Sequence, residues 1–376
     1  MKYASVRLGD ITKNLDRRRK PLNERQRKAI SGKKQYPYIG ANNIVGYVDD
    51  YLFDEKILCV AEDGGYWGAG ETCAFLYEEK CWVNNHAHVL AETGHARLEY
   101  VMYYLNHADL TKWITGTTRG KLTKSALDHI AIPLPSVGEQ EKLVAIFQAA
   151  EALVKKRKEV LALQDQLRQA LFFEWFDDLV YNPKQYEVVA LQEICDVRDG
   201  THDSPRYVSD GFPLITSKNL AGGELDFRDA KLISARDFDE INKRSKVDQG
   251  DILLPMIGTI GNPVIVQTDA PFAIKNVALL KFTHAQVATN RYLKGLLQSH
   301  YFSYWVERVH RGGTQRFISL GDIRMLPIPL PPMAEQQAYG QVDEQIDRQK
   351  RDMREQLQIL EENWQSILHQ AFQGKM

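Results

Sequence analysis

The sequence predicts an α/β protein with two mixed α/β domains, separated by two long antiparallel coiled-coil helices and related by a pseudo-twofold internal repeat. Three observations predict this class. A ten-residue stretch recurs 196 residues later, a long uninterrupted helical pattern follows each copy, and short β-rich runs precede each copy. The length of 376 residues fits two or three folding units.

The repeat is clearest where each globular block ends. Ile132–Glu141 reads IPLPSVGEQE and Ile328–Gln337 reads IPLPPMAEQQ, with six of ten positions identical. Upstream, Tyr36–Ile39 matches Phe212–Ile215 once insertions are allowed. A period near 190 residues is far too long for a solenoid and indicates a duplicated domain pair. The predicted segments are residues 1–138 and 181–333, both globular, and 139–180 and 334–376, both helical.

The globular blocks have the pattern of mixed α/β domains. Short apolar runs rich in β-forming residues are bounded by Gly and Asn turns, and two longer amphipathic stretches predict helices packed on a sheet. The predicted strands are Tyr36–Ile39, Lys56–Ala61, Cys81–Leu90, Phe212–Ile215, Asp251–Met256 and Ala273–Phe282, and the predicted helices are Leu98–Ile114 and Asn290–Val309.

Each helical block begins after a Pro-rich stop and contains no Gly or Pro between residues 141 and 181, or between 341 and 373. A helix of about 36 residues spans about 54 Å. The predicted pairing face of the first helix consists of Ile146, Ala150, Leu153, Val160, Leu161, Leu167 and Leu171. We expect the two helices to pair with each other; two surface helices, each packed on its own domain, are the open alternative.

Composition restricts the class of protein further. The net charge is −1, with mildly basic globular blocks and acidic helical blocks. No apolar run reaches the roughly 20 residues that cross a bilayer, and the N-terminus lacks the apolar core of a signal peptide. The four cysteines form no C-x-x-C pair. We therefore expect a cytoplasmic protein with no membrane partner.

The sequence contains no motif typical of the enzyme classes considered. The sequence has no phosphate-binding P-loop, no dinucleotide-binding glycine motif after a strand, and no Asn-Pro-Pro-aromatic tetrad. His86 and His88 lie near Cys73 and Cys81, but their spacing fits no standard zinc pattern. Chemistry carried by a duplicated domain should occur twice, and none does. We expect no catalytic residue and no bound metal.

Loops suited to DNA do occur twice. Glycine-rich turns with hydroxyl and basic side chains let backbone N–H groups, Arg and Lys approach phosphates, and Asn and Arg are natural readers of base edges. An ordinary solvated loop is the alternative for any one of these residues. The candidate DNA-binding residues are Arg17, Arg18, Arg19, Lys33, Lys34, Asn42, Asn43, Thr117, Arg119, Lys121, Arg198, Thr201, His202, Arg206, Ser217, Lys218, Asn219, Arg311, Thr314 and Arg316.

These features together resemble the specificity subunit of type I restriction–modification systems over essentially the whole chain. The resemblance rests on Tyr36–Ile44, Asp199–Pro205 with Thr216–Leu220, the two Ile-Pro-Leu-Pro-x-x-x-Glu-Gln stretches, and the ending Gln370–Gly374. It implies two target recognition domains, each reading one half of a bipartite, asymmetric double-stranded DNA site. It also implies that the helices set the spacing between half-sites and dock two modification (methyltransferase) subunits.

The same resemblance implies which groups lie elsewhere in the complex. A restriction (motor-nuclease) subunit can join, and S-adenosylmethionine, Mg and ATP are expected on partner subunits, with no cofactor on this chain. The candidate partner-binding residues are Glu139, Gln140, Glu335 and Gln336. A scaffold protein without DNA affinity is one competing interpretation, and a methyltransferase or nuclease is the other. Loss of sequence-specific binding on mutation of Arg119 and Arg316 would argue against the scaffold, and a cofactor-binding assay would test for the enzyme.

Overall fold

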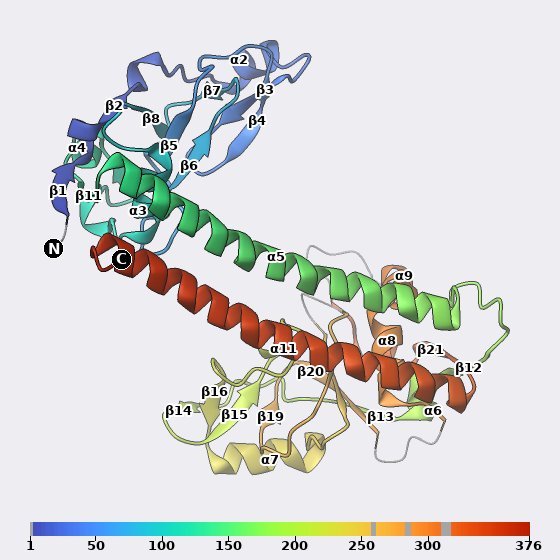
Figure 1. Ribbon diagram of the computed structural model, residues 1–376. Helices are drawn as coiled ribbons and strands as arrows, with labels where there is room; N and C mark the ends of the chain where they lie inside the picture. Colours follow the sequence, from blue (N-terminus) through green and yellow to red (C-terminus); the bar gives the residue numbers. More distant parts are fainter. Residues whose placement is uncertain (1–2, 257–260, 283–286, 310–316) are drawn as a thin grey trace. The chain divides into compact units, whose positions relative to one another are not determined.

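The computed structural model describes residues 3–256, 261–282, 287–309 and 317–376, which form two compact units. Unit 1 comprises Met1–Lys158 with Glu355–Met376, and unit 2 comprises Glu159–Arg354. Each unit contains one mixed α/β domain and one half of each of two long helices, α5 (Val137–Phe176) and α11 (Met333–Phe372) (Figure 1). The predicted fold class is therefore confirmed, whereas the predicted segment boundaries stay a prediction, because these units divide the chain inside the helices.

The domain of unit 1 is built on two sheets. A four-stranded sheet has the order β2-β8-β5-β6 and a three-stranded sheet the order β4-β3-β7, while β1 pairs with β11 and β9 with β10. Its elements are β1 (Ala4–Arg7), α1 (Leu8–Ile11), β2 (Thr12–Asn14), η1 (Asp16–Arg18), α2 (Glu24–Ala29), β3 (Tyr36–Ile39), β4 (Ile44–Val48), β5 (Ile57–Ala61), β6 (Ala74–Tyr77), β7 (Trp82–Val83), β8 (Ala87–Glu92), α3 (Leu98–His107), η2 (Thr111–Trp113), β9 (Ile114–Thr115), β10 (Lys121–Leu122), α4 (Lys124–Asp128) and β11 (Ala131–Leu134).

The domain of unit 2 repeats this plan with two four-stranded sheets, β13-β20-β17-β18 and β14-β16-β15-β19, and with β12 paired to β21. Its elements are β12 (Glu187–Ala190), α6 (Leu191–Ile194), β13 (Asp196–Asp199), β14 (Tyr207–Val208), β15 (Phe212–Ile215), η3 (Ser217–Leu220), β16 (Lys231–Ile233), α7 (Ala235–Ser245), β17 (Ile252–Pro255), β18 (Val264–Ile265), β19 (Ala273–Ile274), β20 (Val277–Lys281), α8 (Asn290–Gln298), α9 (His300–Val309), α10 (Leu320–Arg324) and β21 (Pro327–Leu330).

The internal repeat is confirmed in the strand pairing. The Ile-Pro-Leu-Pro segments are the strands β11 and β21, and each pairs antiparallel with the first strand of its own domain. Proline is tolerated in such a two-stranded edge because one side of each strand needs no backbone donor. In both domains a tyrosine hydroxyl, of Tyr100 on α3 or Tyr292 on α8, donates to the carbonyl of the first proline of this segment, Pro133 or Pro329.

Two predicted strands are each broken by the structure. The predicted strand Cys81–Leu90 is divided into β7 and β8, and Ala273–Phe282 is divided into β19 and β20. The break falls where the chain leaves one sheet and enters the other. The predicted helix Leu98–Ile114 ends at His107, and Asn290–Val309 is interrupted at Ser299.

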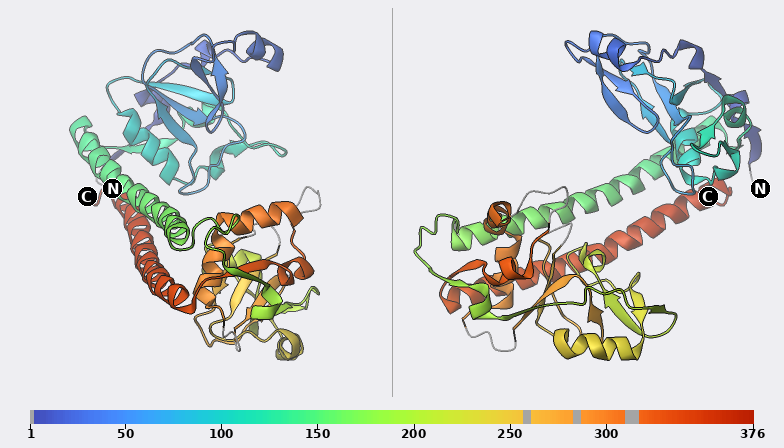
Figure 2. Two further views of the ribbon diagram at one scale, coloured as in Figure 1. Left: turned by 90° about the vertical axis from the view of Figure 1, so that its right-hand side faces the viewer. Right: turned by 180° about the vertical axis from the view of Figure 1, so that it is seen from behind.

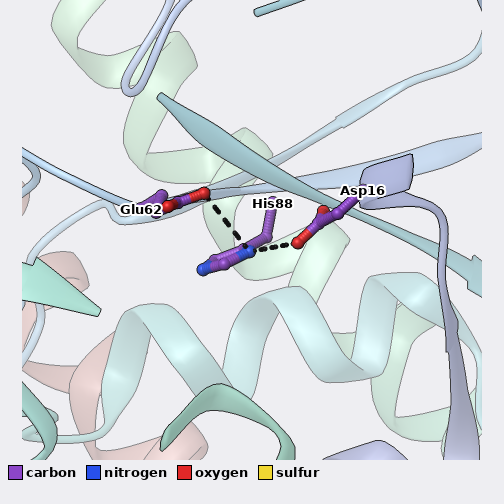
Figure 3. A group of neighbouring side chains, drawn as sticks. All are labelled: Asp16, Glu62 and His88. Atoms are coloured by element: carbon purple, nitrogen blue, oxygen red, sulfur yellow. Dashed lines mark hydrogen bonds and ion pairs between the residues drawn. The ribbon is translucent and has the colours of Figure 1, made fainter. Parts of the chain in front are cut away.

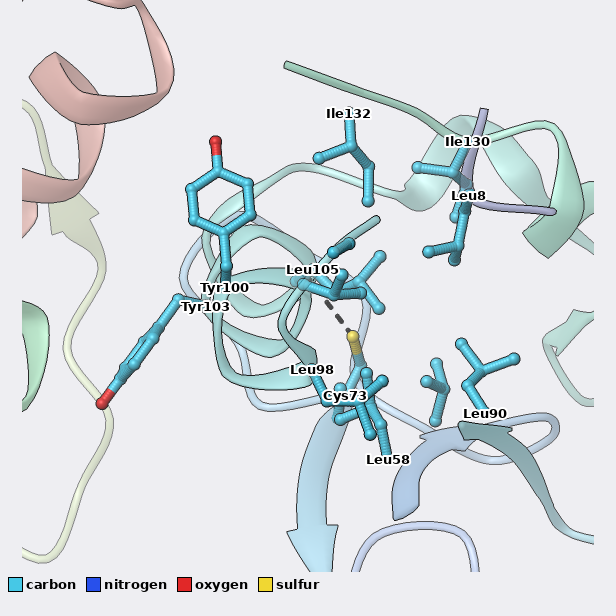
Figure 4. Packing of buried hydrophobic residues seen from close by; sticks show 14 of the residues in the cluster. Leu8, Leu58, Cys73, Leu90, Leu98, Tyr100, Tyr103, Leu105, Ile130 and Ile132 are labelled. Atoms are coloured by element: carbon cyan, nitrogen blue, oxygen red, sulfur yellow. Dashed lines mark hydrogen bonds between the residues drawn. The ribbon is translucent and has the colours of Figure 1, made fainter. Parts of the chain in front are cut away.

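The core of unit 1 lies between the four-stranded sheet and helix α3. Leu58 and Leu90 on the sheet pack against Leu98 and Leu105 on α3, all with at most 1% of their surface exposed (Figure 4). Cys73 lies in this layer, its thiol 3.5 Å from the carbonyl oxygen of Leu105, and burial raises its pKa to about 12. All four cysteines are buried and free of disulfides.

The long helices pair differently in the two units. In unit 1, Phe147 of α5 meets Trp364 and Phe372 of α11 in an aromatic cluster with Tyr103. In unit 2, Phe172 of α5 packs edge-on against Tyr339 of α11. Within each unit the helix segments lie side by side and run antiparallel, as predicted (Figures 1 and 2).

Unit 2 adds a buried network of charges. Arg168 of α5 bonds Asp343 and Asp347 of α11, and both carboxylates also bind Arg291 and Lys294 of α8. Helix α8 approaches closely because residue 295 is glycine: a Cβ there would lie 2.6 Å from both Phe172 and the Tyr339 hydroxyl. Burial alone would raise the pKa of Asp347, but Lys294 and Arg168 outweigh it and hold that pKa well below its ordinary value.

The predicted pairing face of α5 is partly wrong. Ile146, Leu153, Val160 and Leu167 are exposed, with Leu153 the most exposed at 55%. The residues that meet α11 include Phe147, Arg168 and Phe172, which lie about 100° away around the helix. The sequence contains two apolar rows, and the more regular one does not face the partner helix. Among the described residues, no helix is long and apolar enough to span a membrane.

Asp347→Asn tests the buried charge network. Above pH 5 the carboxylate is ionised in both states. Removing it leaves Arg168, Arg291 and Lys294 to share the single carboxylate of Asp343, so we expect the free energy of unfolding to fall by about 3 kcal/mol. A carboxyl group with a lowered folded-state pKa loses its stabilising effect as the pH falls below its ordinary value of 3.8. The difference between the two chains should therefore narrow from pH 5 to pH 3, as measured by calorimetry.

The matched control is Glu240→Gln, which removes an exposed carboxylate paired with Lys243 in the same unit. It should leave the melting temperature unchanged at every pH. An Asp347→Asn chain as stable as the parent at pH 7 would contradict the network's role.

Candidate nucleic-acid interface

Each domain has a polar cleft at the ends of two parallel-paired strands. The first cleft, in unit 1, has a volume of about 440 Å³ and is lined by the loops that follow β3 and β7. Its polar side chains are Glu24, Arg27, Asn42, Asn43, Asn84, Asn85, His86 and Arg119. The amide oxygen of Asn42 is buried and has no hydrogen-bond partner among the described residues.

The second cleft, in unit 2, has a volume of about 690 Å³. It is lined by the loops that follow β15 and β19, together with residues on and near β14 and β16. Three lysines and two aspartates give it a net positive lining. Its polar side chains are Tyr207, Thr216, Ser217, Lys218, Asn219, Asp226, Asp229, Lys231, Lys275 and Asn276.

The two clefts occupy equivalent positions in the repeat. β3 pairs parallel with β7 just as β15 pairs parallel with β19. The next residue continues the ladder in both cases: Asn84 N–H donates to Ile39 at 3.1 Å, and Lys275 N–H donates to Ile215 at 2.9 Å. The backbone frame is therefore shared, while asparagine in one cleft is replaced by lysine in the other.

Two basic or polar loops that could not be aligned in sequence also lie at equivalent places. Residues 17–20 follow β2, and residues 200–206 follow β13, which are the corresponding edge strands of the two four-stranded sheets. The second of these loops meets the second cleft: Thr201 forms a parallel bridge with Lys275, whose ammonium group lies on Ser204. Insertions conceal this equivalence in sequence, and the strand pairing reveals it.

A charged network lies beside the first cleft. His88 is buried, and its ring contacts Asp16 at 2.6 Å and the carbonyl oxygen of Leu122 at 2.8 Å (Figure 3). Asp16, Glu62 and His88 are close enough to suggest a metal site. Arg19 and Lys121, however, also bind these carboxylates. Arg19, Lys121 and the His88 ring thus already surround the two carboxylates, which leaves little electrostatic reason for an ion.

The same contacts set the ionisation of the two carboxyl groups. Burial alone would raise the pKa of Asp16, but the hydrogen bond and charge of His88 lower it overall. Burial acts likewise on Glu62, and the bonds from Arg19 and Lys121 bring its pKa below the ordinary value. Both carboxylates are therefore ionised at neutral pH and fix the surrounding cations.

Several predicted DNA-binding residues lie at the clefts or at their exposed rims. Asn42, Asn43 and Arg119 line the first cleft, and Ser217, Lys218 and Asn219 line the second. Thr117 lies in the loop from β9 to β10, where Gly116 has φ +96°, and Lys121 begins β10. Arg17, Lys33, Lys34, His202 and Arg206 are exposed, while Arg198 and Thr201 are partly buried. Their contact with DNA stays a prediction.

Other predicted residues are already used inside the protein. Arg18 binds Glu55 and lies over the Phe53 ring, and Arg19 is held by Asp16, Glu62 and the carbonyl of Ala87. The side-chain oxygen of the buried Asn219 accepts hydrogen bonds from the N–H and the hydroxyl of Thr216, the residue that precedes η3. These contacts give the three residues a structural role, and their contact with DNA also stays a prediction. Arg311, Thr314 and Arg316 lie outside the described residues.

The predicted partner-binding glutamines are fully buried. Gln140 bonds His95, Pro135 and the N–H of Arg97, and Gln336 forms the same set with Val287, Pro331 and the N–H of Thr289. Each glutamine therefore anchors the start of a long helix to its domain. Glu139 and Glu335 are only partly buried, and their docking role stays a prediction.

The cleft residues that were not predicted from the sequence include Asn84, Asn85, His86, Lys231, Lys275 and Asn276. Five of them lie at the break in a strand that was predicted to be continuous. The Asn-Asn and Lys-Asn pairs, which disfavour strands, were the available signal. A positive φ at Asn276 marks the second of these breaks.

Comparison with known proteins gives consistent matches. The family model described as type I restriction modification DNA specificity domain matches residues 1–163 and again residues 183–362. A Haemophilus influenzae protein, described provisionally as a type I restriction enzyme specificity subunit, is 25% identical over 351 residues, which cover 88% of this chain and 83% of that protein. The specificity subunit of the Escherichia coli type I restriction enzyme EcoBI is 23% identical over 68% of this chain and 60% of its own.

The fold has a match among solved structures. The crystal structure of the S subunit of a type I restriction-modification system from M. genitalium aligns with a TM-score of 0.59 and 13% identity. The alignment covers 97% of this chain and 95% of the other. At this identity the likeness concerns the fold alone.

Gly200→Ala tests the contact between the 200–206 loop and the second cleft. A Cβ at this position would lie 2.3 Å from the carbonyl oxygen of Ile274, so the loop must shift. We expect a loss of about 1–3 kcal/mol in the free energy of unfolding and faster hydrogen exchange at residues 200–206 and 274–276. The control Gly222→Ala meets no atom within 4 Å. Equal exchange in the two variants would contradict the tight contact.

Proposed function

This chain belongs to the type I restriction modification DNA specificity family, and we propose that each of its two domains reads one half of a bipartite, asymmetric double-stranded DNA sequence. The observation that carries the proposal is the pair of equivalent clefts with different linings. The shared frame suits one kind of ligand, while the different side chains suit two different base sequences.

The cleft chemistry suits base edges. Asparagine offers a donor and an acceptor and matches adenine in the major groove, whereas lysine and arginine donate to the acceptors of guanine. The first cleft is rich in asparagine and the second in lysine. With a net charge of −1 the chain has little electrostatic attraction for DNA, so we expect partner subunits to supply many of the phosphate contacts.

We propose that this chain performs no catalysis itself. S-adenosylmethionine, Mg and ATP are assigned to partner subunits, which are two modification (methyltransferase) subunits and, where present, restriction (motor-nuclease) subunits. The charged groups beside the first cleft form a closed network of ion pairs, which supports a role in recognition rather than in proton transfer.

The exposed apolar row on α5 supports docking of a methyltransferase subunit. Within unit 2, Val160, Leu163 and Leu167 lie on one exposed face, with Leu163 59% exposed. Residues spaced by three, four and seven positions form the face that an amphipathic partner helix would cover. At the matching positions of α11 the repeat has Gln356, Ile359 and Asn363, which makes that face more polar.

The helices also suit the role of a ruler between half-sites. Each has 40 residues, or about 60 Å at 1.5 Å per residue. Inserting residues into a helix should therefore change the unspecified gap in the DNA site and leave both half-sites unchanged.

Methylation mapping tests the proposal. The chain is expressed with its modification subunit in a methylation-free host, and adenine modification is read across the genome by single-molecule sequencing. We expect one motif with two different half-sites around a fixed gap. Replacing residues 181–331 by those of a relative should change one half-site only. A stable complex with no motif would overturn the proposal and favour a scaffold.

Substitutions at the clefts should act on one half-site each. Asn43→Ala, in the first cleft, should weaken discrimination in the first half-site, and Lys218→Ala should do so in the second, each about tenfold at one or two base pairs. Binding to duplexes with single base changes measures this. Lys243→Ala, on an exposed helix face paired with Glu240, is the charge-matched control. An equal effect on both half-sites would contradict the assignment.

Removing the apolar row should weaken partner docking. Val160→Gln with Leu167→Asn gives α5 the residues that α11 has at the matching positions, and we expect binding of one methyltransferase subunit to weaken roughly tenfold per substitution. Native mass spectrometry of the complex should then show loss of one copy. Asn363→Ala, at the matching position of α11, is the control. Full retention of both copies would contradict docking on this face.

A further inference from the structure

Asp63 in unit 1 contacts two different side chains of the first cleft, a histidine and an arginine. Its carboxylate oxygens lie 2.8 and 3.0 Å from Nδ1 of His86, and Oδ1 lies 2.9 Å from a guanidinium nitrogen of Arg119. The carboxylate is mostly buried, with 18% exposed, whereas the Arg119 side chain is 60% exposed. His86 and Arg119 both line the first cleft.

The residue after Asp63 makes this arrangement possible. Gly64 has φ +62°, and a Cβ there would lie 2.7 Å from the Arg119 guanidinium. The guanidinium group therefore lies directly against bare backbone, in a place that any side chain would fill. This close fit limits the conformations open to Arg119, which an exposed arginine would otherwise sample freely.

Asp199 in unit 2 repeats the arrangement. It is 8% exposed, accepts from Arg244 through one oxygen, and lies 2.9 Å from Nε2 of His202 through the other. The other ring nitrogen of His202 lies 2.8 Å from the amide oxygen of Asn276, which lines the second cleft. Here too a glycine follows the aspartate, and Gly200 packs tightly on the carbonyl of Ile274.

The two aspartates are not equivalent in the repeat. Asp63 follows β5, whereas Asp199 ends β13, which corresponds to β2. Duplication of one ancestral contact therefore does not account for the likeness. Each domain contains, at a different point of its fold, one shielded carboxylate that contacts an exposed arginine and a histidine. In unit 1 both of these line the first cleft, and in unit 2 the histidine reaches the second cleft through Asn276.

We propose that Asp63 and Asp199 are positioning residues for DNA reading: each fixes an arginine and a histidine, Arg119 with His86 and Arg244 with His202, in the orientation that contacts one half-site. Arginine discriminates a base only when its fork is aligned with two acceptors. A shared carboxylate supplies that alignment before DNA arrives and so reduces the ordering cost of binding. This inference rests on the proposed function.

Asp63→Asn and Asp199→Asn separate positioning from simple electrostatics, because the two predict opposite results. Each substitution removes a negative charge near the DNA, so an electrostatic role alone predicts tighter binding to every sequence. Positioning predicts about a tenfold loss of discrimination at one or two base pairs, confined to the first half-site for Asp63→Asn and to the second for Asp199→Asn. Binding of the complex with the modification subunit is measured on duplexes with every single base change.

Further variants test whether each carboxylate acts through its arginine. If Asp63 acts through Arg119, the double variant Asp63→Asn/Arg119→Ala should discriminate no worse than Arg119→Ala alone. Arg119→Lys keeps the charge but not the fork, and should lose discrimination while keeping the salt dependence of binding. Asp10→Asn and Glu240→Gln, which disrupt exposed ion pairs with Arg7 and Lys243, are the controls and should change neither.

The outcomes distinguish this inference from the function on which it rests. A parent chain that shows no preference among duplexes overturns both. A parent chain with two half-sites, combined with unchanged discrimination in Asp63→Asn and Asp199→Asn, overturns the positioning role alone. Loss of discrimination accompanied by a lower melting temperature and rescued by stabilising conditions assigns a merely structural role and also overturns it.

Discussion

The structure depends on the packing of half of each long helix into each domain. Neither sheet could bury its helix layer alone, because α3 and α8 expose an apolar side that only the long helices cover. Buried glutamines fix where each helix begins, through three identical hydrogen bonds in the two halves. At Gly295 the missing side chain lets α8 touch both α5 and α11. The cleft loops are thus held by sheets whose hydrophobic cores include the helices.

The two long helices contact each other through aromatic residues in unit 1 and through a buried ion pair at the equivalent positions in unit 2. The offset of 196 residues relates Phe147 to Asp343, and Arg168 to Trp364. In the structure Phe147 contacts Trp364, and Arg168 contacts Asp343. One of these two contacts between the helices is therefore aromatic and the other ionic. If α5 paired antiparallel with a second α5, Phe147 would face Arg168, and a second α11 would place Asp343 against Trp364. Such pairs leave buried charges uncompensated, which costs several kcal/mol and disfavours association between like helices.

The features that could be predicted from the sequence rest on local residue patterns. Predictions were wrong where contacts between distant segments determine which face of an element is buried. The duplication, the long helices and the strands β3, β5, β15 and β17 were correctly predicted, because propensity and periodicity act over neighbouring residues. Helix α5 has two apolar rows, and the choice of the inward one depends on aromatic residues and a buried ion network contributed by distant segments. The buried Gln140 and Gln336 looked like surface residues because glutamine is usually exposed. The cleft itself arises where a predicted continuous strand moves between sheets, and local sequence gives only a weak signal for that crossing.

A duplicated fold can take two different ligands only if its frame and its contact residues vary independently. Here the hydrogen bonds from residues 84 and 275 to the neighbouring strand use backbone atoms alone, so asparagine and lysine leave the same loop path. The side chains project from strand ends, where few core contacts constrain them, and substitution there costs little stability. The layer that faces the long helices is constrained, because changing Phe147 would disturb partners on α3 and α11, and changing Arg168 would disturb two carboxylates on α11. Substitution is therefore tolerated at the clefts and destabilising at the helices, as the proposed reading of two unlike half-sites requires.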